Sequence, residues 1–365
     1  MKLLFFASDY EIGLSTLLTQ QAMAYNAEGI DLVCVAGEME QEQGLSLQME
    51  ESSVRLIRMN GLDKHARFFH LTKEIESIIN EHNIACVHVQ NNWQLTLITY
   101  LKMLKRIPGK TKVIYTLHGF RHNYIVWSTI ATILIGLALL LFADKTFIMS
   151  NPVKKKFRLI SYKTSKLYLG VDTSFFKKQT NEIDTSHIRM IFPAQFRYGK
   201  NQNLLIRAVA RYVKQTSDES IQLYLPGSGD SHRINKAKQL AKQLGVEKCI
   251  MFSGFCSRKE ILELYEKCNI GVIPSNFETF GQCIVEPYVL GKCIVSRNVG
   301  VAADIIEKGK NGFLFHSEDD LLNILLKFSE NKAIIKEIGD INFSNRDVFR
   351  WSNIAKKYAQ ELNTL

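Results

Sequence analysis

The sequence lacks the cysteine spacing of a disulfide-rich or cysteine-bound metal protein. Its seven cysteines are odd in number and scattered, and no two form a C-x-x-C pair. Most stand within apolar runs, which is typical of reduced core residues in a cytosolic protein. The cysteines therefore indicate packing rather than cross-linking.

The sequence also lacks a recognisable targeting signal, an internal repeat and a low-complexity tract. The N-terminal MKLLFFASDYE has one lysine and a short apolar run before two acids arrive, too short for a signal peptide. We expect this segment to form a first buried strand. Hydrophobic residues make up 46% of the 365 residues and charged residues 22%, which suits a soluble protein of two domains.

Strand-like and helix-like segments alternate in two successive series. In the first half the predicted strands are Leu3–Ala7, Leu32–Val35, Val54–Arg58, Cys86–Val89, Val113–Leu117, Thr146–Met149 and Lys166–Leu169, separated by helices such as Thr16–Glu28, Thr72–His82 and Gln94–Lys105. In the second half they are Arg189–Pro193, Gln222–Leu225, Cys249–Phe252, Ile270–Ile273 and Cys293–Val295, with helices near Asn203–Lys214, Ser231–Leu244 and Lys259–Lys267. This alternation predicts two doubly wound parallel sheets. The polar run Lys177–His187 marks the boundary between them.

The segment IPSNFETFGQCIVE, Ile273–Glu286, carries the most specific chemistry. A strand runs into a loop with Glu278, and after Phe280-Gly281 a helix begins that carries Glu286. A helix start beyond a sheet edge directs backbone N–H groups and the positive end of the helix dipole at an anion such as phosphate. Two carboxylates beside it can accept hydrogen bonds from sugar hydroxyls. The combination indicates a nucleotide-sugar site, although two solvated acids would give the same spacing.

With its flanks Gly291–Val295, Gly300 and Asn311-Gly312, this segment resembles the donor-site motif of the retaining glycosyltransferases of family 4. The resemblance implies the GT-B fold, two Rossmann-like α/β domains facing across a cleft. It implies an acceptor-binding domain at 1–180, a nucleotide-sugar domain at 181–345 and a C-terminal helix at 346–365 that could cross back to the first domain. Leu169–Thr173 resembles the turn that ends the first domain in this family.

The resemblance also implies roles for individual residues. Glu278 would hold hydroxyls of the donor sugar as a catalytic residue, and Glu286 would hold the ribose. The donor would further contact the helix start, Thr279, Phe280, Gly281 and Gln282, and the first glycine turn at Gly13, where the family usually has two glycines and a plain turn is an alternative.

Two further segments match the family in part. His118 ends an apolar strand, at the edge where doubly wound sheets bind ligands, and by resemblance would contact the donor sugar or diphosphate as a catalytic residue. Lys200 matches the family lysine that holds the diphosphate. Gln195 stands where the family has arginine and Arg197 is two residues late, so either could replace it; we expect Arg197 to take part because the leaving diphosphate needs positive charge. Pro226–Asp230 resembles the family's glycine loop.

Positive charge is concentrated in Leu101–Lys166, which holds thirteen Lys and Arg against one acid, a net charge of +12 in a chain of +10. Within it, Ile125–Ala143 is uncharged and would be roughly 28 Å long as a helix. It could span a bilayer, cover the sheet as a buried helix, or lie on a membrane surface with Lys154, Lys155, Lys156 and Arg158 against anionic lipid. We favour the membrane surface.

The sequence therefore predicts a retaining glycosyltransferase that moves a sugar from a nucleoside-diphosphate-sugar to a lipid-linked or membrane-anchored glycan. We expect a cytoplasmic enzyme peripheral to the inner face of the cell membrane, with no metal and no other cofactor. A two-domain sugar-nucleotide isomerase is the alternative. A nucleic-acid-binding protein, which would interleave aromatic and basic residues on an exposed face, fits less well, and no nucleic acid is expected as a partner.

Overall fold

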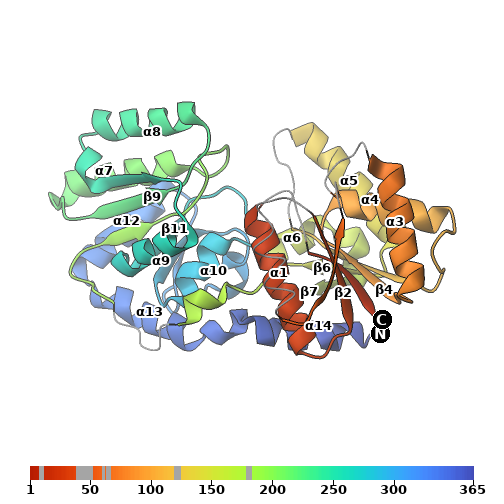
Figure 1. The fold of residues 1–365 in the computed structure, drawn as a ribbon. Helices are drawn as coiled ribbons and strands as arrows, with labels where there is room; N and C mark the ends of the chain where they lie inside the picture. Colours follow the sequence, from red (N-terminus) through yellow and green to blue (C-terminus); the bar gives the residue numbers. More distant parts are fainter. Residues whose placement is uncertain (8–11, 38–51, 60–61, 63–66, 119–124, 178–182) are drawn as a thin grey trace. The chain divides into compact units, whose positions relative to one another are not determined.

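The structure, a computed structural model, describes all residues except 8–11, 38–51, 60–61, 63–66, 119–124 and 178–182. The side chains of 12–15, 125–132 and 159 are also outside the description. The chain divides into two compact units (Figure 1): unit 1 comprises Met1–Asp172 and Phe349–Leu365, and unit 2 comprises Thr173–Val348. The first division falls eight residues before the position 180 expected from the sequence. The second falls three residues after the expected 345.

Unit 1 is built on a seven-stranded parallel sheet of order β3-β2-β1-β4-β5-β6-β7. Its elements are β1 (Leu3–Phe6), α1 (Ile12–Ala27), β2 (Leu32–Gly37), β3 (Arg55–Met59), α3 (Phe68–Glu81), β4 (Cys86–Val89), α4 (Asn92–Met103), β5 (Lys112–Thr116), α5 (Ile125–Phe142), β6 (Lys145–Ile148), α6 (Asn151–Lys156), the 3-10 helix η3 (Arg158–Lys163), β7 (Thr164–Lys166) and α14 (Trp351–Leu362). The strand order changes direction between β1 and β4. Strand β7 begins two residues and ends three residues before its predicted place.

Unit 2 is built on a six-stranded parallel sheet of order β10-β9-β8-β11-β12-β13. Its elements are η4 (Thr173–Phe176), β8 (Arg189–Ile191), α7 (Gln202–Thr216), β9 (Gln222–Pro226), α8 (Ser231–Gln243), η5 (Glu247–Cys249), β10 (Ile250–Gly254), α9 (Arg258–Lys267), β11 (Ile270–Ile273), α10 (Gln282–Val289), β12 (Cys293–Arg297), α11 (Ala302–Ile305), β13 (Phe313–Phe315), α12 (Glu318–Glu330) and α13 (Ala333–Ser344), followed by η6 (Arg346–Phe349) at the division. Here the order reverses between β8 and β11. The short strand β13 was not predicted from the sequence.

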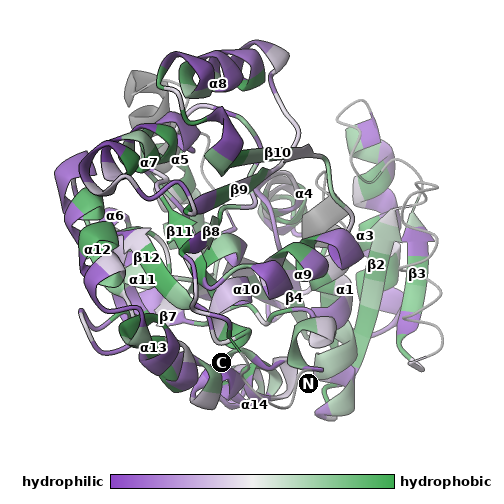
Figure 2. Cartoon of the chain, turned by 90° about the vertical axis from the view of Figure 1, so that its left-hand side faces the viewer, coloured by the Kyte–Doolittle hydropathy of each residue, from purple (hydrophilic) through white to green (hydrophobic). Residues whose placement is uncertain are grey.

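The central strands form the cores of both units because they are apolar on both faces, as expected of parallel sheets covered by helices, whereas the edge strands β3 and β7 are more polar and partly exposed. All four residues of β1, β4 and β11 are buried. Figure 2 shows β2 and β11 as hydrophobic and α8 as largely hydrophilic. The seven cysteines are free, and all except Cys256 are buried.

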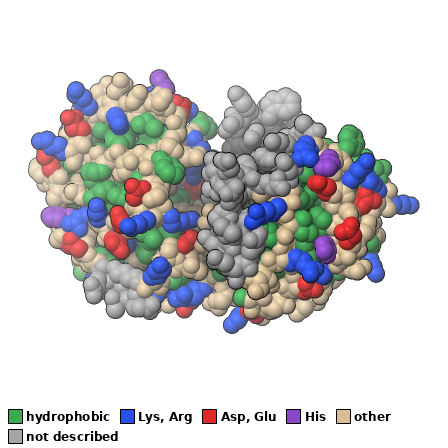
Figure 3. Space-filling view, in the orientation of Figure 1, with side chains coloured by type: hydrophobic (Ala, Val, Ile, Leu, Met, Phe, Trp, Pro, Cys, Tyr) green, Lys and Arg blue, Asp and Glu red, His purple; other side chains and the backbone are tan. Residues whose placement is uncertain are grey.

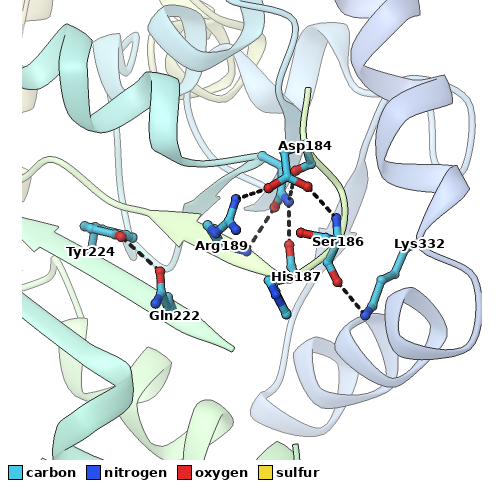
Figure 4. Close-up of polar contacts among 8 residues, drawn as sticks. Asp184, Ser186, His187, Arg189, Gln222, Tyr224 and Lys332 are labelled. Carbon is cyan, nitrogen blue, oxygen red and sulfur yellow. Dashed lines mark hydrogen bonds and ion pairs between the residues drawn. The ribbon is translucent and has the colours of Figure 1, made fainter. Parts of the chain in front are cut away.

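The entry to the sheet of unit 2 is fixed by polar contacts around Asp184 (Figure 4). The Asp184 carboxylate accepts hydrogen bonds from Arg189 Nη1 at 2.6 Å and from the Ser186 backbone N–H at 2.8 Å. These bonds hold the pKa of Asp184 well below its usual range. Asn269, before β11, donates to the Asp184 and His187 carbonyls and accepts from the Arg189 N–H, so it joins β8 to its neighbouring strand. Residues 178–182 of the predicted boundary lie outside the described residues.

The last helix, α14, packs on α1 within unit 1. The ring of Tyr358 stacks on Tyr25 with centroids 4.0 Å apart, and its hydroxyl lies 2.8 Å from His88 Nδ1. Trp351 covers Gly170, where a Cβ would lie 2.3 Å from the indole. The turn that resembles the end of the family's first domain is thus closed by the C-terminal helix, and only glycine fits beneath the tryptophan.

Candidate functional site

The site of unit 2 forms where the strand order reverses, at the carboxyl ends of β8 and β11. In doubly wound sheets this is the position at which ligands bind. The loops after the two strands are tied together: the Asn276 N–H donates to the Gly199 carbonyl at 2.8 Å, and Asn201 Nδ2 donates to the Pro274 carbonyl at 3.0 Å. Residues 73 and 77 positions apart in sequence are thereby held side by side.

These loops bring Lys200 and Glu278 together. Lys200 Nζ lies 2.5 Å from Glu278 Oε1, and each side chain is only about one-tenth exposed. Cys283, in the first turn of α10, has its Sγ 4.0 Å from the same oxygen. A largely shielded ion pair therefore lies beside the start of α10, where a positive charge and a hydrogen-bond acceptor are available to one ligand.

Two glycines shape the loop that carries Glu278. Gly281 precedes α10 with φ +98°, in the left-handed region that favours glycine. Gly300 has φ +51°, and a Cβ there would lie 2.3 Å from the Phe280 carbonyl oxygen and 2.9 Å from Glu278 Cβ. The Val301 N–H donates to that carbonyl at 2.8 Å. The glutamate is therefore positioned by a backbone 22 residues further along the chain.

Glu286, in α10, is bound by two residues that the sequence analysis did not identify. Arg258 Nη1 donates to Glu286 Oε1 at 3.1 Å, and the Tyr265 hydroxyl donates to Oε2 at 3.2 Å. Burial raises the pKa of Tyr265 well above its usual value, and the charge of Glu286 raises it further. The Arg258 guanidinium also lies 5.6 Å from the centroid of the Phe175 ring. Ser257 and Glu260 form a capping box that marks the start of α9 in the sequence, but nothing local shows that α9 faces α10.

The loop after β8 carries the two residues that could replace the family arginine. Gln195 and Arg197 are both exposed, whereas Phe196 between them is buried and bridges Gly229 of the glycine loop. Gly227 has φ +153°, and a Cβ there would lie 2.0 Å from the Ala194 carbonyl oxygen. Among the residues that the structure describes, Arg197 has no ion-pair partner.

A cavity of about 250 Å³ lies beside this glycine loop. It is lined by Phe196, Leu225, Gly227, Ile234, Lys238, Phe252, Ser253 and Gly254. The rings of Phe196 and Phe252 are 6.2 Å apart, and Lys238 Nζ lies 5.8 Å from the Phe252 centroid. An aromatic, partly polar cavity of this kind suits a flat heterocycle.

In unit 1 the corresponding reversal point is between β1 and β4. Gly13 lies in the first turn of α1, which follows β1. His118 follows β5, and its Nε2 lies 2.7 Å from Oε1 of Gln90, which directly follows β4. Burial lowers the pKa of His118 to about 3, so the imidazole is neutral. Gln90 was not identified from the sequence, although its place after a buried strand matches that of His118.

His88 is a structural residue. It is fully buried in β4, with Nε2 2.6 Å from Thr116 Oγ1 and Nδ1 2.8 Å from the Tyr358 hydroxyl. Burial lowers its pKa well below 6.5, and His118 nearby lowers it further. Both ring nitrogens are occupied, so His88 holds β4, β5 and α14 together.

The basic block places an apolar face beside exposed lysines. In the described part of α5, Ile133, Leu134, Leu137 and Leu141 are 47–70% exposed, whereas Leu139 is buried. Lys163 of η3 donates to the Leu140 and Ala143 carbonyls at 2.7 and 2.8 Å and so caps α5. Lys154, Lys155, Lys156 and Arg158 are all exposed. Elsewhere, on the face seen in Figure 3, basic and acidic side chains are interspersed over both units.

The helices and side-chain clusters of the described residues bear on membrane insertion and metal binding. No helix in that part of the chain is long and apolar enough to cross a membrane. In the same part, no group of three or more His, Cys, Asp and Glu side chains could hold a metal ion.

Comparisons with known proteins agree with this architecture. Residues 173–340 match the family described as glycosyl transferases group 1. The chain is 28% identical over 177 residues to an uncharacterized glycosyltransferase, MJ1607, of Methanocaldococcus jannaschii, covering 46% of this chain and 43% of the relative. It is 25% identical over 200 residues to a D-inositol 3-phosphate glycosyltransferase of Corynebacterium aurimucosum, covering 51% and 48%. The matches span less than half the length of these curated relatives.

The whole chain superimposes on a solved structure, HepE of Anabaena in complex with UDP-glucose, with a TM-score of 0.78 and 19% identity over 100% of both chains. At that identity the likeness shows the fold. The chain therefore consists of two Rossmann-like domains of the GT-B type, and residues 173–340, within its second unit, match the glycosyl transferases group 1 family.

Proposed function

We propose that this protein is a retaining, metal-independent glycosyltransferase that moves a sugar from a nucleoside-diphosphate-sugar to a lipid-linked or membrane-anchored glycan in polysaccharide biosynthesis. The observation that supports this most directly is the shielded Lys200–Glu278 pair at the start of α10. Such a pair offers one positive group for phosphate and one acceptor for a sugar hydroxyl at the same place.

In this reaction, negative charge develops on the departing diphosphate in the transition state. That charge is neutralised by Lys200, Arg197 and the start of α10. Glu278 holds hydroxyls of the transferred sugar as it becomes oxocarbenium-like. The acceptor attacks from the front face, and the leaving phosphate takes the acceptor proton.

The remaining contacts would bind the donor without reacting. Glu286, oriented by Arg258 and Tyr265, holds the ribose. The cavity between Phe196 and Phe252 takes the base. Because the fold relative from Anabaena is recorded with UDP-glucose, that donor is the first to test.

The acceptor side of the proposal depends on unit 1. The exposed apolar face of α5 and the lysines Lys154–Lys156 together suit the surface of an anionic membrane, which combines apolar burial with charge attraction. An acceptor anchored in that membrane would be presented at the cytoplasmic face.

The test is the release of nucleoside diphosphate from a panel of nucleotide-sugars, with and without a lipid-linked glycan extract. Release that depends on the extract supports transfer. Conversion of the donor without any acceptor favours the isomerase. A parallel reaction in EDTA tests metal independence: loss of activity that Mg²⁺ or Mn²⁺ restores would contradict the role given to Lys200 and α10.

A further inference from the structure

Gln90 and His118 form a hydrogen-bonded pair at the carboxyl edge of the unit 1 sheet. Gln90 is 1% exposed and directly follows β4. Its backbone N–H donates to Gln94 Oε1 at 2.7 Å, and the Gln94 N–H donates to Asn91 Oδ1 at 2.9 Å. These two hydrogen bonds fix the backbone of Gln90 against the start of α4. The Gln90 side chain is directed at His118.

The chemistry of the amide determines the protonation of the ring. Gln90 Oε1 can only accept, so at 2.7 Å the proton lies on His118 Nε2 and Nδ1 carries a lone pair. His88, whose pKa the neighbouring His118 lowers further, is itself neutral and held by Thr116 and Tyr358. The imidazole is therefore an uncharged donor on one side and an acceptor on the other.

Two atoms of this pair are buried without a hydrogen-bond partner in the described part of the chain: His118 Nδ1 and Gln90 Nε2. One is an acceptor and the other a donor, and they belong to side chains in contact. Buried polar atoms are rarely left unpaired, because the loss of hydration is not offset. A hydroxyl group, which donates and accepts at once, matches both.

We propose that Gln90 is a positioning residue that locks His118 in its neutral Nε2–H tautomer, so that His118 Nδ1 and Gln90 Nε2 together bind a hydroxyl of the sugar substrate. That the hydroxyl belongs to a sugar rests on the proposed function. The arrangement decides between the two ligands that resemblance allowed for His118: a neutral ring with a free lone pair binds a hydroxyl and cannot compensate the charge of a diphosphate.

The tautomer can be measured without any activity. In two-bond ¹H–¹⁵N spectra of labelled protein, wild-type His118 is expected to show a protonated Nε2 and an unprotonated Nδ1 from pH 8 to pH 5. A protonated Nδ1, or titration near pH 6.5, would overturn the proposal whatever the enzyme's reaction proves to be. A variant with His118→Gln identifies the signal.

Two substitutions separate positioning from packing. Gln90→Leu removes the acceptor and the donor, so the tautomer preference should be lost and kcat/KM for the donor should fall about tenfold to a hundredfold. Gln90→Glu keeps the acceptor but adds a charge that stabilises imidazolium, so His118 should titrate at higher pH and the pH–rate profile should gain a new limb. Gln222→Leu, in β9 of unit 2, is the matched control and should leave both readouts unchanged. If Gln90→Leu folds with the wild-type tautomer and kinetics, Gln90 only fills space.

Discussion

At the scale of single residues, substitutions of the two glutamates should change different kinetic constants. If Glu286 holds the ribose in ground and transition states alike, Glu286→Gln should raise the donor KM with little change in kcat, whereas Glu278→Gln should lower kcat. Steady-state kinetics with a saturating acceptor measure both. A large kcat loss at unchanged KM for Glu286→Gln would contradict the ribose role.

The truncation Glu286→Ala has a second effect that the structure makes visible. It removes the acceptor of both Arg258 and the buried Tyr265 hydroxyl, so it should also destabilise unit 2 by about 1–3 kcal/mol. The glutamine variant preserves an acceptor and is the cleaner test.

Gly300 gives a prediction about loop placement. Alanine there would be strained at φ +51° and would push on the Phe280 carbonyl and Glu278 Cβ. We expect Gly300→Ala to reduce kcat at least tenfold, because a displaced loop misplaces the glutamate. Gly309→Ala is the control: its φ is +80°, but nothing lies within 4 Å of its Cβ position. A wild-type kcat in Gly300→Ala would contradict the prediction, and an equal loss of kcat in both variants would mean that backbone strain alone is enough to cause it.

At the scale of elements, a buried hydroxyl of α14 reaches the sheet of unit 1, beside the contacts of Glu361 with Lys145 and Ser165. Tyr358→Phe leaves His88 Nδ1 without its partner and should destabilise unit 1 by about 1–3 kcal/mol. Urea unfolding measures the change. Tyr162→Phe, at a side chain that is 72% exposed, should change stability by less than about 0.5 kcal/mol.

The helix α5 and its basic neighbours should bind anionic vesicles. Replacing Lys154, Lys155 and Lys156 with glutamate should cut vesicle sedimentation and activity on a lipid-linked acceptor, with little effect on a short soluble acceptor. Salt should weaken wild-type binding only in part, because it screens charge over about 10 Å at 0.1 M but does not reduce apolar burial. The same charge change at Lys214, Lys242 and Lys248, exposed on unit 2, is the control. Wild-type sedimentation by the first triple variant would exclude the membrane surface.

At the scale of the whole molecule, the two units should respond differently to acid. His88 and His118 stay neutral in folded unit 1 because burial lowers their pKa values, while in the unfolded chain each takes a proton below about pH 6.5. The unfolded state then binds more protons, so stability falls as pH falls. Each histidine should cost about 2 kcal/mol between pH 7.5 and pH 5.

Tryptophan fluorescence can measure this loss of stability in unit 1. The chain's three tryptophans, Trp93, Trp127 and Trp351, all belong to unit 1, so tryptophan fluorescence follows the unfolding of that unit alone, and far-ultraviolet circular dichroism follows both. We expect the fluorescence midpoint in urea to fall at acid pH. A midpoint unchanged from pH 7.5 to pH 5 would mean that the two histidines are protonated in the folded state.

The positions of most strands and helices along the chain could be predicted from the sequence, because each depends mainly on the residues within it. Apolar runs such as Cys86–Val89 and Ile270–Ile273 are strands with the predicted bounds, and the family motif predicted the GT-B architecture. The three-residue strand Phe313–Phe315 escaped prediction because so short a run carries no periodicity.

The contacts that define the candidate site were decided by the tertiary structure. Arg258 and Tyr265 reach Glu286, Gln90 reaches His118, and Gly300 makes room for Glu278, in each case between segments that sheet order brings together. Sequence by itself determined which residues could carry charge, donate or accept, because that is a property of each side chain. Which of them meet depends on the order of parallel strands and on where α14 returns, since those alone set the distance between residues far apart in the chain.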